Sequence, residues 1–273
     1  MKRLILTLLA VFSFLMVVSA QDVDQAPPVL EDGEYEFELT AELNTSLFTF
    51  YAEEGDEVSI SMTQDIDELD PFIVIIAPDG TVFAADDDSG DVGLSSLLED
   101  LEIEETGLYT LIASSYIYID TFFTDQWETQ PEEQPYVLTI EGVSSTGDDE
   151  IADLLEGSGY VFMEDGFEET FDIDSDQQAV FFAFEGEEGD EIDIDIAVMG
   201  GDDFFNPIIH VFNEDGERIA LDYGVDELEL EDDGTYYVML VDEFFYATVD
   251  YGTVAEDDVE ASSGEVEVSF SQN

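Results

Sequence analysis

The chain has 273 residues, of which 45% are hydrophobic, and it sets 72 acidic residues against three basic ones, for a formal net charge of −69. So few cations cannot contact a phosphate backbone or an anionic lipid surface, which excludes nucleic acid and anionic membranes as partners. The many Phe, Tyr, Ile and Val residues provide for a packed core, so the high charge does not indicate disorder here.

Residues 1–20 are predicted to be a signal peptide. A basic pair precedes an apolar run over 4–18, and small residues follow at 18–20. The run is shorter than the roughly 20 residues that a membrane-spanning helix needs, so we expect cleavage before Gln21 and a product secreted outside the cytoplasm. That product would keep Arg218 alone against 72 acids, a formal charge of −71, and no cysteine for disulfides.

The rest of the chain repeats itself. Residues 48–62 recur at 182–196, an offset of 134, and both copies alternate apolar and polar side chains. This period of two is typical of strands with one buried face. The sequence Glu-Glu-Gly-Asp-Glu inside each copy is predicted to be the turn of a hairpin, with Gly55 and Gly189 available for a positive φ.

Two further blocks repeat in the same order. The apolar run 70–76 matches 206–212, and 106–112 matches 233–239. Final strands are expected at 136–140 and 265–270.

These patterns predict an all-β fold. Sustained helical periodicity is absent from the sequence, and short apolar runs alternate with Gly, Asp and Pro turns. We therefore expect two tandem antiparallel jelly-roll-like β-sandwich domains after the signal peptide. The expected boundaries are 29–143 for the first domain, 144–156 for a linker, and 157–272 for the second, more divergent domain.

The order of these motifs resembles the bacterial pre-peptidase C-terminal domain family. The resemblance rests on the aromatic strand, the Glu-Glu-Gly-Asp-Glu turn, the Asp-Pro strand, Ala-Asp-Asp-Asp-Ser-Gly at 85–90, and Thr-Gly-Leu-Tyr-Thr at 106–110. It covers nearly all of the first repeat, whereas the second repeat lacks the Asp-Asp-Asp-Ser-Gly loop. It implies small, non-catalytic jelly-roll-like modules of exported proteins, several of which bind calcium or adhere to a substrate.

The acidic loop of the first repeat is the strongest candidate for a site. Calcium prefers six to eight oxygen ligands, and closely spaced carboxylates on a glycine-containing loop supply several. The expected ligands are Asp86, Asp87, Asp88 and Asp91, with Asp70 approaching from its strand. The competing interpretation is a solvated acidic turn in a chain that is acidic throughout.

The resemblance also implies a metal site just before the first strand of each module and in the loop that follows. The first repeat has Asn-Thr-Ser at 44–46, which departs from that pattern, and the second has Asp-Ser-Asp at 174–176, an incomplete match.

An aromatic insertion offers a second candidate site. Tyr116, Tyr118 and Trp127, together with Phe122 and Phe123, are able to form a stacking platform for a sugar or peptide. Aromatic residues at 244–246 and 251 are their counterparts in the second repeat. Ordinary packing of loops and edge strands is the preferred interpretation of both groups.

The sequence argues against most enzymes. His210 is the only histidine and lies in an apolar strand, cysteine is absent, and no Gly-x-Ser-x-Gly motif occurs. With one His and no Cys, the chain also lacks the ligands of a typical zinc site. Asp-Ser-Gly at 88–90 lacks the second copy that an aspartic peptidase needs.

We therefore expect a secreted, non-catalytic accessory or binding protein that calcium stabilises and that meets an extracellular protein or glycan surface. One alternative is a carbohydrate-binding or glycoside-cleaving protein, since that chemistry needs only two carboxylates. The other is that the acidity itself is an adaptation to a saline environment.

Overall fold

The computed structural model describes residues 27–40, 45–64, 69–90, 93–115, 134–146, 160–174, 177–203, 205–242 and 262–273, together with Leu154 and Phe245. The expected signal peptide lies outside the described residues. No helix in the described part of the chain is long and apolar enough to cross a membrane.

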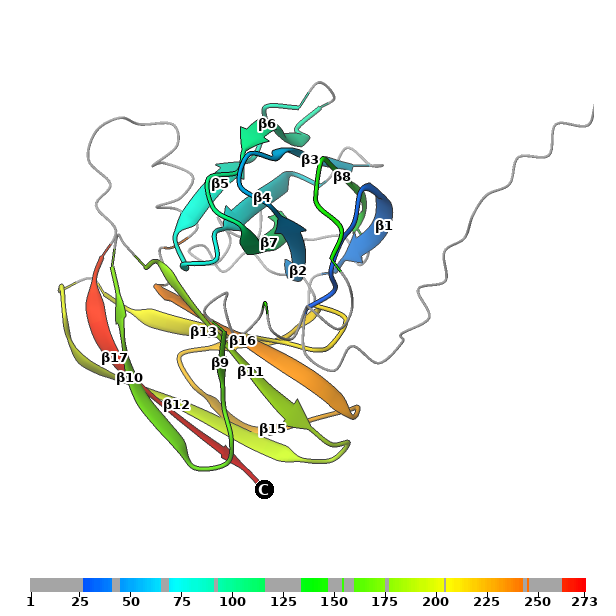
Figure 1. Ribbon diagram of the computed structural model, residues 1–273. Coiled ribbons are helices and arrows are strands. Elements are labelled where there is room, and N and C mark those ends of the chain that lie inside the picture. The colour runs from blue at the N-terminus through cyan, green and yellow to red at the C-terminus, as the bar shows by residue number, and fades with distance from the viewer. Residues whose placement is uncertain are drawn as a thin grey trace, which may run out of the picture.

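The first repeat forms two four-stranded antiparallel sheets (Figure 1). Its outer sheet has the order β1-β8-β3-β6, and its inner sheet has the order β2-β7-β4-β5. The strands are β1 (Gly33–Leu39), β2 (Thr45–Ala52), β3 (Glu57–Gln64), β4 (Pro71–Ile76), β5 (Val82–Asp86), β6 (Ser96–Glu102), β7 (Gly107–Ser115) and β8 (Gln134–Glu141).

The second repeat has the same architecture with one added strand. Its outer sheet has the order β10-β17-β12-β15, and its inner sheet has the order β14-β13-β16-β11-β9, in which β9 alone pairs in parallel. The strands are β9 (Tyr160–Phe162), β10 (Phe167–Ile173), β11 (Ala179–Gly186), β12 (Glu191–Gly201), β13 (Pro207–Phe212), β14 (Arg218–Asp222), β15 (Val225–Glu229), β16 (Gly234–Asp242) and β17 (Gly264–Gln272). The expected all-β fold, with an antiparallel sandwich for each repeat, is confirmed.

The predicted hairpins at the Glu-Glu-Gly-Asp-Glu turns are wrong. In the first repeat β2 pairs with β7 and β3 pairs with β6 and β8, so the turn carries the chain from the inner to the outer sheet. Its backbone bonds to the segment after β6 instead, since Gly55 N donates to Ile103 O at 2.8 Å and Ile103 N donates to Asp56 O at 2.9 Å. The positive φ expected at the glycine is present, at 93° for Gly55 and 90° for Gly189.

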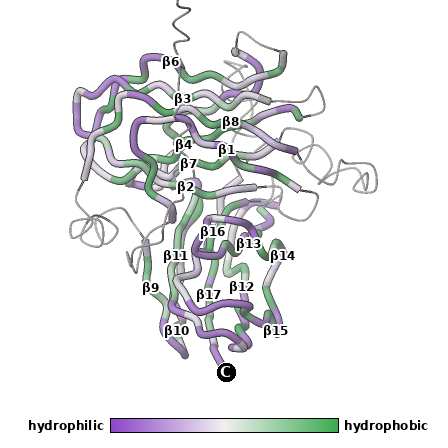
Figure 2. The backbone as a smooth tube through the Cα atoms, turned by 90° about the vertical axis from the view of Figure 1, so that its right-hand side faces the viewer, coloured by the Kyte–Doolittle hydropathy of each residue, from purple (hydrophilic) through white to green (hydrophobic). Residues whose placement is uncertain are grey.

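Each sandwich has its own core, and a third apolar layer lies between the two inner sheets. Phe48 and Phe50 face the first core, whereas Leu47, which directly precedes Phe48, packs against the second repeat. In the second repeat Phe182 faces its own core and Phe181 faces the first repeat. Figure 2 shows β7 and β2 lying beside β16 and β13, with hydrophobic strands between the outer sheets. The inner strands are therefore buried on both faces, which is why they read as continuous apolar runs.

Candidate functional site

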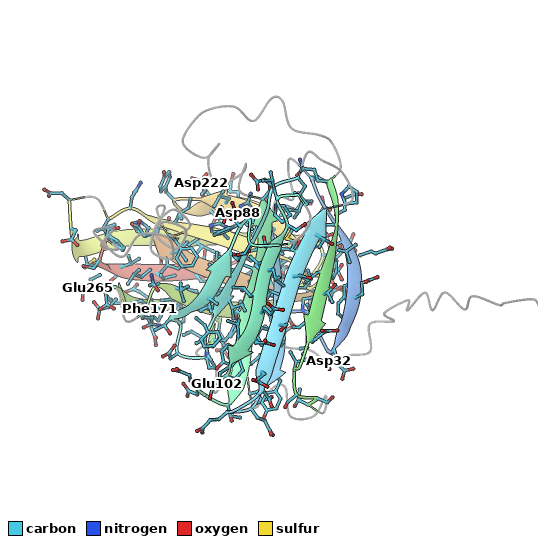
Figure 3. All side chains as sticks on the ribbon, turned by 90° about the horizontal axis from the view of Figure 1, so that it is seen from above. Asp32, Asp88, Glu102, Phe171, Asp222 and Glu265 are labelled. Atoms are coloured by element: carbon cyan, nitrogen blue, oxygen red, sulfur yellow. The ribbon has the colours of Figure 1, made fainter. Side chains whose placement is uncertain are left out.

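One end of the first sandwich gathers six of its buried polar side chains, and we call it the polar end. The pairings Leu39 with Gln134, Pro71 with Ser115 and Ile73 with Asp86 bring strand ends of both sheets to this end. Asp88 lies here, opposite the end that carries Asp32 and Glu102 (Figure 3). The buried polar residues at this end are Thr45, Ser95, Ser96, Ser114, Ser115 and Gln134.

Asp86 holds the acidic loop closed. Its Oδ2 accepts hydrogen bonds from Leu97 N at 2.7 Å and Ser89 N at 3.1 Å, and its Oδ1 accepts one from Ser89 Oγ. Gly90 N donates to Ser95 O at 2.7 Å, and a Cβ at Gly90 would overlap that carbonyl. The carboxylate of Asp86 thus fixes the shape of its own loop.

Asp70 lies against the same loop, where the structure brings it near Asp87 and Asp88. Burial, followed by the charges of Asp87 and Asp88, raises the pKa of Asp70 from its ordinary value of 3.8 to about 6. Asp91 lies outside the described residues. Among the described residues, no three acidic, His or Cys side chains are already arranged to hold a metal ion.

The polar end also contains buried side chains that have no hydrogen-bond partner among the described residues. Ser115 Oγ, next to Pro71 in the sheet, and both polar side-chain atoms of Gln134 have none. At the position of Ser115 the second repeat has Asp242, whose Oδ2 accepts a bond from Asn206 N at 2.9 Å. A buried polar group left unsatisfied costs about 1–3 kcal/mol, so the polar end of the first repeat is suited to an added polar ligand or water.

The second repeat lacks the acidic group. Asn206 replaces Asp70, and Asp222, at the end of β14, accepts a bond from Tyr223 N at 2.7 Å. At the expected site over 174–176, Asp174 Oδ1 accepts a bond from Gln177 N at 3.1 Å, and the next two residues lie outside the described part.

The other predicted positions divide between buried and undescribed residues. Thr45 and Ser46 are buried, and Thr45 Oγ1 lies 3.3 Å from Ser114 Oγ, whereas Asn44 lies outside the described residues. Phe245 is buried in the layer between the inner sheets, where it packs and cannot stack on a ligand. Tyr116, Tyr118 and Trp127 lie outside the described residues.

His210 is enclosed between the repeats. It is 3% exposed, its ring stacks on Phe212 with centroids 6.2 Å apart, and its Nδ1 lies 3.5 Å from Arg218 Nη1. Burial and the charge of Arg218 hold the pKa of His210 well below its usual range. The chain's single imidazole is therefore neutral and shielded from a substrate in solvent.

The outer sheet of the second repeat presents carboxylates to solvent. Its pairing places Glu168 and Asp195 on either side of Ser269, and Glu267 opposite Thr170. Like charges directly opposite each other destabilise a sheet. Hydroxyl residues separate the acids at these positions, whereas Asp172 lies directly opposite Glu265. The only basic side chains in the described part of the chain, Arg218 and His210, are buried between the repeats. No protein cation is available there for these exposed carboxylates.

No protein-family profile matches this chain, and no curated protein matches it. Solved structures to which it is similar include the pre-peptidase C-terminal domain of a collagenase from Bacillus anthracis, at 14% identity and a TM-score of 0.32, over 45% of this chain and 100% of that one. The periplasmic g-type lysozyme inhibitor PliG of Aeromonas hydrophila is similar at 12% identity and a TM-score of 0.29, over 42% of this chain and 96% of that one. The turret protein A223 of Sulfolobus turreted icosahedral virus is similar at 9% identity and a TM-score of 0.18, over 88% of this chain and 97% of that one. At these values the likenesses establish neither a family nor an activity.

Proposed function

We propose that this is an exported, non-catalytic binding protein whose two sandwich modules attach to an extracellular protein or glycan surface. The observation that carries the proposal is the burial of Arg218 and His210 between the repeats. Exposed carboxylates without a cation of their own repel one another, which destabilises the compact state. Their counter-charge must come from outside, as bound cations or as the positive groups of a partner.

A non-catalytic role agrees with the chemistry of the described residues. His210 is buried, neutral and next to Arg218, so it does not serve as a general base for a solvent-borne substrate. The resemblance of the first repeat to an accessory module of exported proteins supports the same role and an extracytoplasmic location.

Calcium is the cation that the polar end of the first repeat would take. Asp70, Asp87 and Asp88 approach one another closely enough to raise the pKa of Asp70. Carboxylate and hydroxyl oxygens are the ligands that calcium prefers, and Ser115 Oγ is buried nearby with no partner among the described residues. Asp86 would hold the loop in shape rather than bind the ion, because its oxygens already accept three hydrogen bonds.

The proposal is tested by comparing calcium with sodium chloride of equal ionic strength. Calcium should raise the melting temperature further than sodium, because specific coordination adds to general screening. The double variant Asp87→Asn/Asp88→Asn should lose this excess effect. The matched control Glu99→Gln/Glu102→Gln removes two exposed charges from the same sandwich and should keep it. Identical melting curves in the two salts would refute calcium binding.

A further inference from the structure

The layer between the inner sheets is built from equivalent residues of the two repeats. Leu47 corresponds to Phe181 at the offset of 134, and Ile76 corresponds to Phe212 at the offset of 136. All four belong to one buried apolar cluster. Each repeat thus presents the same face of its inner sheet to the other, as the subunits of a two-fold dimer do.

The backbone contacts across this layer join equivalent turns to equivalent strands, although the strand residue differs by two positions, since Leu47 corresponds to Phe181 and Ala179 to Thr45. The turn after β13 reaches the start of β2, where Leu47 N donates to Gly216 O at 2.7 Å. The equivalent turn after β4 reaches the start of β11, where Ala179 N donates to Gly80 O at 3.3 Å. Each repeat therefore uses one turn to add a hydrogen bond to the first strand of its partner's inner sheet.

Both contacts require glycine. A Cβ on Gly80 would lie 2.8 Å from Ala179 O, and a Cβ on Gly216 would overlap Leu47 O. The two glycines also have positive φ values of 84° and 75°. The turns are thus shaped for close approach to the other repeat as well as for their own geometry.

Side chains next to the turns make the two halves of the interface different. Arg218 follows the second turn, and its Nη1 donates to Thr45 Oγ1 of the first repeat at 3.3 Å. Val82 holds the equivalent place after the first turn. Its side chain is uncharged, and its backbone N donates to Gln178 Oε1 of the second repeat at 3.3 Å. These polar contacts favour pairing of a first repeat with a second repeat over pairing of like repeats.

We infer that this face is a protein–protein interface in its own right, whose partner is the other repeat, and that the two sandwiches stay associated without the connection between them. An apolar layer with a few matched hydrogen bonds around it has the anatomy of a stable interface between separate chains. The covalent connection then raises the local concentration of the halves but is not what holds them together.

The test is to cut the connection in the folded full-length protein. Residues 147–152, which lie outside the described residues, are replaced by the recognition sequence of a site-specific protease. After cleavage the two halves should elute as one complex in size-exclusion chromatography at micromolar concentration. Separation of the halves, whether folded or unfolded, would overturn the inference.

A pair of glycine variants in the cleavable protein tests whether these turn contacts hold the two halves together. Gly216→Ala should raise the dissociation constant of the cut halves by about tenfold or more, a change worth about 1.4 kcal/mol. Gly189→Ala is the matched control, since Gly189 has a φ of 90° but no atom within 4 Å of its added Cβ. If Gly216→Ala does not fold, Gly80→Ala is compared with Gly55→Ala. Gly55 also has a positive φ, but no atom lies within 4 Å of its added Cβ, so it serves as the control for Gly80. Equal effects of the paired variants would contradict the assignment.

Discussion

Replacing Asp70 with Asn should stabilise the metal-free protein at neutral and alkaline pH. The pKa of Asp70 is about 6 in the folded protein, above its ordinary value of 3.8, because the carboxylate is partly buried and faces Asp87 and Asp88. Its charge therefore opposes folding. Below pH 3.8 the group is protonated in both states and has no effect, and the destabilisation grows as the pH rises from 3.8 to about 6 and is complete above that value.

The expected size follows from this difference. One pKa unit is worth about 1.4 kcal/mol, so a change from 3.8 to about 6 corresponds to at most about 3 kcal/mol. Asp70 retains contact with solvent, and screening reduces the effect to about 1 kcal/mol. For a protein of this size, that is a rise in melting temperature of about 2–4 °C.

The assay is thermal unfolding in chelator, followed by circular dichroism at several pH values between 3.5 and 8. Asp70→Asn should match the wild type at pH 3.5 and melt higher at pH 8. Glu102→Gln, an exposed acid at the other end of the same sandwich, should show no such pH-dependent gain. Asn already stands at the equivalent position 206 of the second repeat, so the substitution suits the fold. A lower melting temperature for Asp70→Asn at pH 8 would refute the reasoning.

Four further substitutions probe the packing of the two repeats. Tyr109→Phe and Tyr236→Phe each remove a hydroxyl that donates to the carbonyl of the residue four positions earlier, at 2.8 Å in both repeats. Each should lower the free energy of unfolding, measured in urea, by about 1 kcal/mol. A loss of stability from only one of the two substitutions would contradict their equivalence. His210 has a folded pKa below 6.5, so its contribution to stability is present above pH 6.5 and is lost as the pH falls below that value. His210→Val places the residue of the first repeat here and should flatten the dependence of the free energy of unfolding on pH just below pH 6.5. An unchanged pH dependence would count against a neutral buried imidazole. Thr45→Val removes an acceptor of Arg218 and should lower the free energy of unfolding by about 1–3 kcal/mol, whereas a neutral result would show that this contact does not stabilise the interface.

The alternation of apolar and polar residues was enough to predict most strands and the sandwich in each repeat. It could not distinguish a hairpin from a chain that passes between sheets, because both need a turn with a glycine of positive φ. At Gly55 the difference lies in the bonds to Ile103, a partner distant in sequence. The signal for the interface was present in the unbroken apolar runs of β4 and β13, since a strand that is apolar on both sides must be covered on both faces.

The candidate site was predictable in part. Proximity of Asp70 to the acidic loop follows from the sandwich, because Asp70 precedes β4 and the loop follows β5, the neighbour of β4 in the sheet. The hydrogen bonds of Asp86 to its own loop were not visible in a run of three aspartates, since they depend on the amides of Ser89 and Leu97. Nor could the sequence indicate that Ser115 would be buried without a partner.

The most direct test of the account measures binding and turnover in the same samples. Purified mature protein is incubated with insoluble extracellular proteins and with glycans, with and without calcium, and both the retained protein and any released product are quantified. The account predicts saturable retention on such a surface, weakened by sodium chloride because exposed carboxylates contribute to it, and no product. Product formation that a single carboxylate substitution abolishes would contradict it.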